Sequence, residues 1–129
     1  MSESITVLVV DDEELVRALM QDNLEEAGFS VEDASSAAQA ISMLEAEGAD
    51  YKALVTDVNL GSKVTGWDVA RRARELMHDV PVIYMSGFAG NEWTANGVPN
   101  SILLNKPFAP AQLVTAVSQL LNAAPPPSV

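Results

Sequence analysis

The sequence contains no cysteine among its 129 residues and few basic residues, with 7 Lys and Arg against 18 Asp and Glu. The absence of cysteine excludes a disulfide scaffold, a thiolate metal site and a cysteine nucleophile, and it is compatible with a reducing cytoplasm. A formal net charge of −11 makes the surface repel nucleic acid and anionic lipid. We therefore expect neither nucleic acid nor a membrane as a partner.

The sequence also lacks a long apolar run, which excludes a membrane-spanning helix, and its acidic start is unlike a secretory signal. We therefore expect a cytoplasmic protein. Hydrophobic residues still make up 48% of the chain, enough to build a core. The length fits one domain, which we place over residues 1–122. Three successive prolines stop any helix in residues 123–129, so we expect a disordered tail there.

Apolar, β-branched runs alternate with helical periodicities along the chain. The first run, Ile5 to Val10, is typical of a strand buried on both faces. We expect strands over residues 5–10, 31–34, 53–56, 82–85 and 102–104, the second of them more polar and at an edge. We expect helices over residues 15–27, 36–48, 69–77 and 91–97, and a last one from residue 110. This alternation predicts an α/β fold, with a parallel sheet covered by helices on both faces.

The helical periodicity also predicts which side chains face the core. For the first helix the pattern selects Leu15, Val16, Leu19, Met20, Leu24 and Ala27, and Gly28 is expected to end it. For the third it selects Val69, Ala70, Ala73, Leu76 and Met77. Ser36 with Gln39 three residues later is typical of a helix start.

Polar residues follow four of the predicted strands at their carboxyl ends. They are Asp11, Asp12, Asp57, Ser86 and Lys106. In an open parallel sheet these ends meet at one edge, where ligands bind. Neighbouring carboxylates repel one another unless a cation joins them, and oxygen ligands without His or Cys favour Mg²⁺, or Mn²⁺, over zinc. Lys106 and Ser86 suit contacts to a phosphoryl group, and Asp57 suits an oxygen nucleophile that forms an aspartyl phosphate.

In this order, these residues resemble the receiver domain of two-component response regulators. The motifs that carry the resemblance are Val9-Val10-Asp11-Asp12-Glu13, Asp57 with Asn59, Ser86-Gly87 and Lys106-Pro107-Phe108, and it covers roughly residues 4–122. It implies a flavodoxin-like doubly wound fold, with five parallel strands in the order 2-1-3-4-5 and five helices. It also implies a cis bond between Lys106 and Pro107.

The resemblance also implies a role for each site residue. Asp57 would be the phosphoacceptor, with Ser86 and Lys106 contacting the phosphoryl group. Mg²⁺ would be bound by Asp11, Asp12, Asp57 and the backbone carbonyl of Asn59. The phosphoryl donor would be a histidine kinase or a histidine phosphotransfer protein, and phosphorylation would switch contacts with a downstream protein. Such a domain promotes its own phosphorylation and dephosphorylation and is not a conventional turnover enzyme.

Leu103 departs from the family, which usually has an aromatic residue three positions before the lysine. Without an aromatic residue at this position, Phe88, Trp93 or a shift of the backbone could replace the usual coupling of a hydroxyl to an aromatic rotation. Leu103 keeps open a receiver-fold module that binds partners without phosphorylation. The sequence also leaves open a receiver domain of a hybrid histidine kinase, and a small phosphatase that uses an aspartyl phosphate. Asp12 could alternatively cap the first helix.

Overall fold

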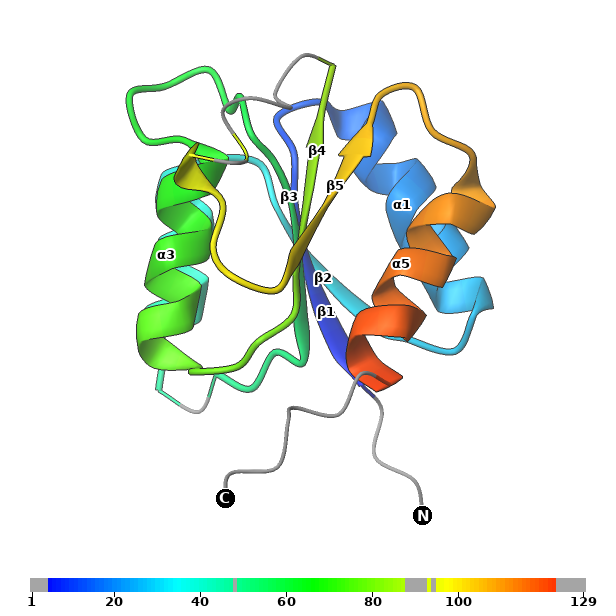
Figure 1. Ribbon diagram of the computed structural model, residues 1–129, viewed down its shortest axis with the longest axis horizontal. Helices are drawn as coiled ribbons and strands as arrows, with labels where there is room; N and C mark the ends of the chain where they lie inside the picture. The colour runs from blue at the N-terminus through cyan, green and yellow to red at the C-terminus, as the bar shows by residue number, and fades with distance from the viewer. Residues whose placement is uncertain (1–4, 48, 88–92, 94, 123–129) are drawn as a thin grey trace.

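A computed structural model describes residues 5–47, 49–87, 93 and 95–122. Within them, five parallel strands form one sheet in the order β2-β1-β3-β4-β5 (Figure 1). The strands are β1 (Thr6–Val10), β2 (Ser30–Ala34), β3 (Ala53–Asp57), β4 (Val82–Ser86) and β5 (Ser101–Asn105). The predicted α/β fold and strand order are confirmed.

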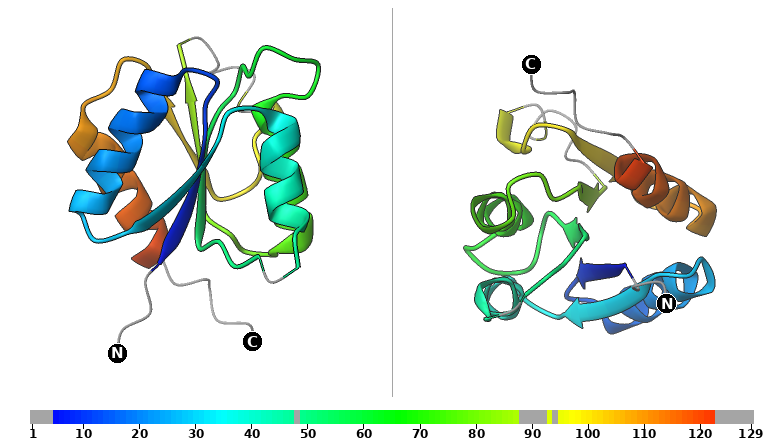
Figure 2. Two further views of the ribbon diagram at one scale, coloured as in Figure 1. Left: turned by 180° about the vertical axis from the view of Figure 1, so that it is seen from behind. Right: turned by 90° about the horizontal axis from the view of Figure 1, so that it is seen from below.

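Helices cover both faces of the sheet. The described part of the chain contains α1 (Glu14–Glu26), α2 (Ala37–Glu45), α3 (Gly66–Leu76) and α5 (Pro110–Asn122). The helices α1 and α5 lie on one face and α2 and α3 on the other (Figure 2).

The prediction of five helices is not met within the described residues. Three of the seven residues of the expected helix over residues 91–97 fall outside them, as does the whole expected tail over residues 123–129. Within residues 91–97, the Gly97 N–H donates to the Trp93 carbonyl oxygen over 2.8 Å, which is the hydrogen-bond spacing of an α-helix. No helix in the part described here is long and apolar enough to cross a membrane.

The polarity of each strand matches its place in the sheet. The central strands β1 and β3 are almost completely buried, in agreement with their apolar runs. The strand β2 exposes Glu32 and Asp33 and lies at an edge, as predicted. Charged side chains on an edge strand discourage pairing with another chain.

Local signals define several helix ends. Ser36 accepts a hydrogen bond from the Gln39 N–H over 3.1 Å and begins α2, as predicted. A capping box of Thr65 and Asp68, which sequence analysis did not identify, begins α3. Gly28, with a φ of +99°, follows the end of α1 and confirms the expected stop.

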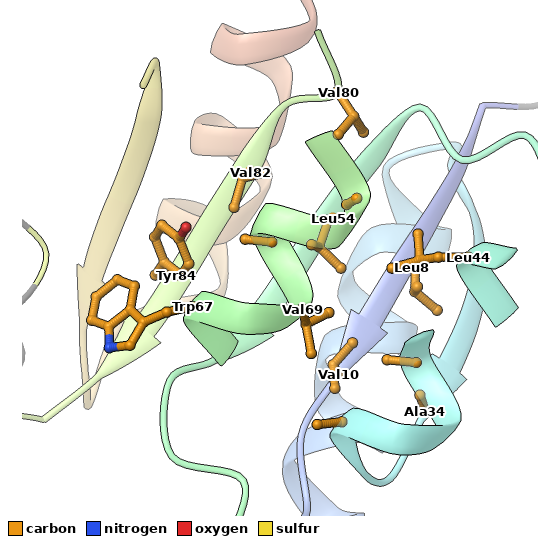
Figure 3. Packing of buried hydrophobic residues seen from close by; sticks show 14 of the residues in the cluster. Leu8, Val10, Ala34, Leu44, Leu54, Trp67, Val69, Val80, Val82 and Tyr84 are labelled. Carbon is orange, nitrogen blue, oxygen red and sulfur yellow. The ribbon is translucent and has the colours of Figure 1, made fainter. Parts of the chain in front are cut away.

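The core consists of two apolar clusters, one on each face of the sheet. Under α2 and α3, the rings of Trp67 and Tyr84 lie beside each other with centroids 4.5 Å apart (Figure 3). Under α1 and α5, Met20, Leu24 and Leu113 pack against the other face. The edge at which the strands end is therefore supported from both sides.

The predicted inward face of α1 is partly wrong. Leu15 and Leu19 are 80% and 62% exposed, whereas Met20 and Leu24 are buried. Residues 16, 20 and 24 form one row along the helix, and residues 15 and 19 form the next row, rotated by about 100°. Only the first row faces the sheet. Ala27 and Leu76, which stand at the ends of α1 and α3, are also exposed.

Candidate functional site

Acidic side chains meet at the carboxyl edge of the sheet. Asp57 is the last residue of β3, and Asp11 directly follows β1, the strand beside it. Each of Asp11, Asp12 and Asp57 offers a carboxylate oxygen within 4.8 Å of the others. The predicted convergence of these carboxylates is confirmed.

Lys106, directly after β5, reaches into this cluster. Its Nζ atom lies 3.1 Å from Oδ2 of Asp57 and 3.3 Å from Oδ2 of Asp11. Burial lowers the pKa of the Lys106 ammonium, but hydrogen bonds and charges of the two aspartates more than offset this and raise the pKa above its ordinary value. Lys106 therefore stays charged, and it links two carboxylates that would otherwise repel each other.

Asp11 is fully buried, and Asp57 is 7% exposed. Burial raises the pKa of the Asp11 carboxyl, and nearby Asp57 raises it further. The hydrogen bond from the Glu13 N–H and the charge of Lys106 act in the opposite direction and only partly offset the rise. One ammonium cannot neutralise three carboxylates, so the cluster retains a negative charge that a cation would compensate.

The main chain around Asp57 is tightly constrained. Its carbonyl oxygen accepts a hydrogen bond from the Thr56 hydroxyl over 2.9 Å, and its Oδ1 accepts one from the Asn59 N–H over 3.3 Å. Gly66 packs so closely that a Cβ atom there would overlap the Asp57 carbonyl oxygen. Asp57 is therefore held with one carboxylate oxygen toward Asn59 and the other toward Lys106.

Ser86 and Asn59 lie beside the cluster. Ser86 is the last residue of β4, and its carbonyl oxygen accepts a hydrogen bond from the Lys106 N–H over 2.9 Å. The Asn59 side chain accepts one from the Gly61 N–H over 3.1 Å. The expected contacts of the Ser86 hydroxyl with a phosphoryl group and of the Asn59 carbonyl with a metal stay predictions. The expected cis bond between Lys106 and Pro107 is present.

The structure also bears on the alternative role of Asp12 and on the position of Leu103. The interpretation of Asp12 as a helix cap is wrong, because the N-cap of α1 is Glu13 and no side chain caps it. Leu103 is partly buried and packs with Trp93 against the cluster under α2 and α3. Phe88, the other aromatic residue considered, lies outside the described residues.

Arg17 also belongs to the site, although no sequence motif indicates it, and donates a hydrogen bond to the Asp11 carbonyl oxygen over 2.8 Å. A contact to a main-chain oxygen depends on the path of the loop, so the spacing of residues in the sequence does not predict it. Arg74, on α3, likewise donates to main-chain oxygens, those of Val80 and Pro99.

Comparisons with known proteins agree with this architecture. The family model of the response regulator receiver domain matches residues 7–118. A crystal structure of a response regulator receiver protein from Sinorhizobium medicae WSM419 is 50% identical, with a TM-score of 0.90, and the match covers 94% of this chain and 97% of that one.

Two curated relatives from Brucella abortus differ greatly in length. Sensor kinase CckA is 32% identical over 124 residues, which are 95% of this chain but 13% of the kinase. Response regulator receiver protein CpdR is 28% identical over 120 residues, which are 92% of this chain and 98% of CpdR. The similarity to the kinase thus concerns a small part of that protein.

Proposed function

Because the chain belongs to the response regulator receiver domain family, we propose that Asp57 accepts a phosphoryl group from a phosphohistidine of a histidine kinase or histidine phosphotransfer protein. As a receiver domain, the chain is a phosphate-accepting signalling module rather than a turnover enzyme. The observation that carries the proposal is the convergence of Asp11, Asp12, Asp57 and Lys106 at one edge of the sheet.

The donor set at this edge suits Mg²⁺. Asp11, Asp12 and Asp57 offer oxygen ligands within 4.8 Å of one another, and Mg²⁺ prefers oxygen ligands. We propose that these three side chains and the Asn59 carbonyl hold Mg²⁺, with Mn²⁺ as a substitute. When bound, the ion would offset the negative charge that the cluster and a phosphoryl group bring together.

The chain's own residues would promote transfer as follows. An Oδ atom of Asp57 attacks the phosphorus, the P–N bond to the donor imidazole breaks, and the nitrogen leaves with the electron pair. The Lys106 ammonium, already 3.1 Å from Asp57, would pair with a phosphoryl oxygen. Ser86 would donate a hydrogen bond to another phosphoryl oxygen. The product is an aspartyl phosphate and a free histidine.

The donor would dock beside α1. Leu19, Phe108 and Pro110 line a mostly apolar groove of about 540 Å³ that also includes Lys106. Leu15, one turn before Leu19 on α1, is also exposed. Because Lys106 belongs to both the groove and the acidic cluster, a protein seated here would bring a phosphohistidine close to Asp57. We propose a cytoplasmic location, supported by the absence of cysteine, and a downstream protein partner for the phosphorylated form.

Intact-protein mass measurement after incubation with acetyl phosphate tests the proposal. We expect an adduct of one phosphoryl group on the wild type with Mg²⁺, and none on Asp57→Asn or after chelation of the metal. Asp22→Asn, which removes an acid outside the cluster, is the matched control and should form the adduct normally. An adduct that persists on Asp57→Asn would disprove the assigned acceptor.

The position of Leu103 favours a second function, a module that binds its partner regardless of phosphorylation. Leu103 packs against the core cluster in place of the aromatic residue usual at this position. Beryllofluoride can imitate the phosphoryl group in a resonance titration of the chain. Shifts that spread into β5 support a phosphorylation-driven switch, whereas shifts confined to the acidic cluster support the constitutive module.

A further inference from the structure

Arg17 joins three parts of the chain beside the acidic cluster. From the first turns of α1, its Nη1 atom donates to the Asp11 carbonyl oxygen over 2.8 Å. Its Nε atom lies 3.1 Å from Oδ2 of Asp33 on β2. The Arg17 side chain is 16% exposed, although Asp33 is 45% exposed. The guanidinium is therefore held between the ends of two neighbouring strands.

The bond from Arg17 completes the fixation of Asp11. The Asp11 N–H donates to the Ala34 carbonyl oxygen over 3.2 Å. Its Oδ1 accepts from the Glu13 N–H over 2.8 Å, and its Oδ2 accepts from Lys106 over 3.3 Å. With the carbonyl oxygen bound by Arg17, each polar group of this buried residue has a partner. These partners come from β2, from α1, from the loop before α1 and from the segment after β5.

Arg17 and Lys106 contact different parts of Asp11. Lys106 binds the carboxylate, where it compensates charge. Arg17 binds the main-chain oxygen, where it fixes the path of the chain from β1 into α1. Asp12 lies on that path, so its position relative to Asp11 depends on the same bond. A planar guanidinium suits this task because its donors can bind two oxygens at once in a fixed arrangement.

We infer that Arg17 is a positioning residue that sets the spacing of the Asp11 and Asp12 carboxylates for cation binding. The inference rests on the proposed function and adds a residue to its site. Groups that orient the ligands of a metal typically change its affinity about 10- to 100-fold when they are lost. An arginine that merely stabilised the surface would leave the affinity unchanged as long as the chain stays folded.

Calorimetric titration of the whole chain with Mg²⁺ tests this inference. Arg17→Met removes both hydrogen bonds but keeps an unbranched side chain of good helix propensity. We expect its dissociation constant for Mg²⁺ to rise about 10-fold. Without any metal, we expect the amide resonance of Glu13 to move, because the Glu13 N–H binds the Asp11 side chain. Arg17→Lys keeps the charge but loses the planar fork, and it carries the test if Arg17→Met does not fold.

Two control variants separate positioning from general effects. Arg72→Met removes an arginine paired with Glu45 on the other face of the sheet and should bind Mg²⁺ normally. Asp33→Asn removes the ion pair but keeps the Asp11 bond, so we expect a smaller loss of affinity than in Arg17→Met. A folded Arg17 variant that binds Mg²⁺ within about twofold of the wild type overturns the inference.

The inference and the proposed function can fail separately. If the wild type takes up a phosphoryl group on Asp57 and the Arg17 variants bind Mg²⁺ as the wild type does, only the role of Arg17 is wrong. If the wild type binds no Mg²⁺ and forms no adduct on Asp57, both are wrong.

Discussion

Gly66 lies where the start of α3 passes against the main chain of Asp57. A Cβ atom at this position would overlap the Asp57 carbonyl oxygen and approach the Cα atom of Val58. Both neighbours are backbone atoms and cannot move aside as a flexible side chain would. The absence of a side chain at Gly66 therefore lets α3 begin directly beside the candidate phosphoacceptor.

We predict that Gly66→Ala destabilises the fold by about 2 kcal/mol, the cost of forcing an extra carbon into a filled space. The prediction opposes helix propensity, which favours Ala over Gly. Urea denaturation measures the change. Gly87→Ala is the control, since a Cβ atom there meets nothing within 4 Å. Equal stability of Gly66→Ala and the wild type would show that the main chain near Asp57 can adjust.

Single residues of the site differ in how far the sequence predicts them. Asp11, Asp57 and Lys106 could be predicted because each ends or follows an apolar run, and parallel strands bring such ends together. Gly66 and Arg17 could not, because their roles depend on contacts with main-chain atoms at the ends of strands. Asp12 was predicted with them as a ligand, although a carboxylate before a helix also suits a cap.

Among the elements, α1 combines a buried row of side chains with an exposed apolar one. Leu19 lines the groove that also includes Lys106, and Leu15 lies one turn earlier. Exposed leucines add nothing to the core, so an interaction surface accounts for them better than folding does.

We predict that Leu15→Gln combined with Leu19→Gln slows phosphoryl transfer from a phosphorylated donor protein about 10-fold. The loss of apolar anchors weakens docking, and each factor of ten corresponds to about 1.4 kcal/mol. Phosphorylation by acetyl phosphate, which needs no docking, should be unchanged. Leu76→Gln, on α3, is the matched control. A similar slowing with both donors would contradict a docking role, because it would place the defect in the site itself.

The elements also show what hydrophobic periodicity can and cannot predict. Runs such as Ile5 to Val10 identify strands well, because a central parallel strand is buried on both faces. The period of α1 is correct, but it cannot separate Leu19, which faces solvent, from Met20, which faces the sheet. Periodicity alone does not assign Trp67 of α3 to core or surface, because its ring packs against the Tyr84 ring of β4.

At the scale of the whole molecule, the alternation of strands and helices does not by itself predict the strand order. The family resemblance is also needed. Alternation predicts a parallel sheet covered on both faces. It does not show that the chain winds from β1 to β2 and then returns past β1 to β3. The site lies at the edge of the sheet where this reversal brings β1 and β3 together, as expected for a doubly wound fold.

The acidic cluster makes the stability of the whole molecule depend on pH. Because burial raises the pKa of Asp11, the folded chain binds this proton more tightly than the unfolded chain does. The stability that this proton contributes is fully present below pH 3.8, the ordinary pKa of an aspartate. It is lost as the pH rises through the higher pKa of Asp11 in the folded chain. The pKa of Lys106 is also raised, so its contribution is fully present below 10.5 and is lost only as pH rises through the folded pKa above that value.

Mg²⁺ should restore the stability that is lost when Asp11 ionises, because the cation and the proton compete for the same carboxylate. We predict that the rise in Tm caused by Mg²⁺ is small near pH 4, grows as Asp11 ionises, and is then constant until Lys106 loses its proton. With free Mg²⁺ at 100 times its dissociation constant, the stabilisation should be about 2.7 kcal/mol. Thermal unfolding followed by circular dichroism measures this rise, and Asp11→Asn should abolish its dependence on pH.

Net charge provides the alternative explanation that this experiment must exclude. A chain with a charge of −11 gains some stability from any divalent cation, because screening weakens its self-repulsion. Screening acts on all carboxylates, so it would also raise the Tm of Asp11→Asn, and NaCl at equal ionic strength would reproduce part of it. A specific site instead gives a rise that saturates at low Mg²⁺ and persists in Asp22→Asn. A rise in Asp11→Asn as large as in the wild type would assign the effect to screening and leave the acidic cluster without a measurable part in it.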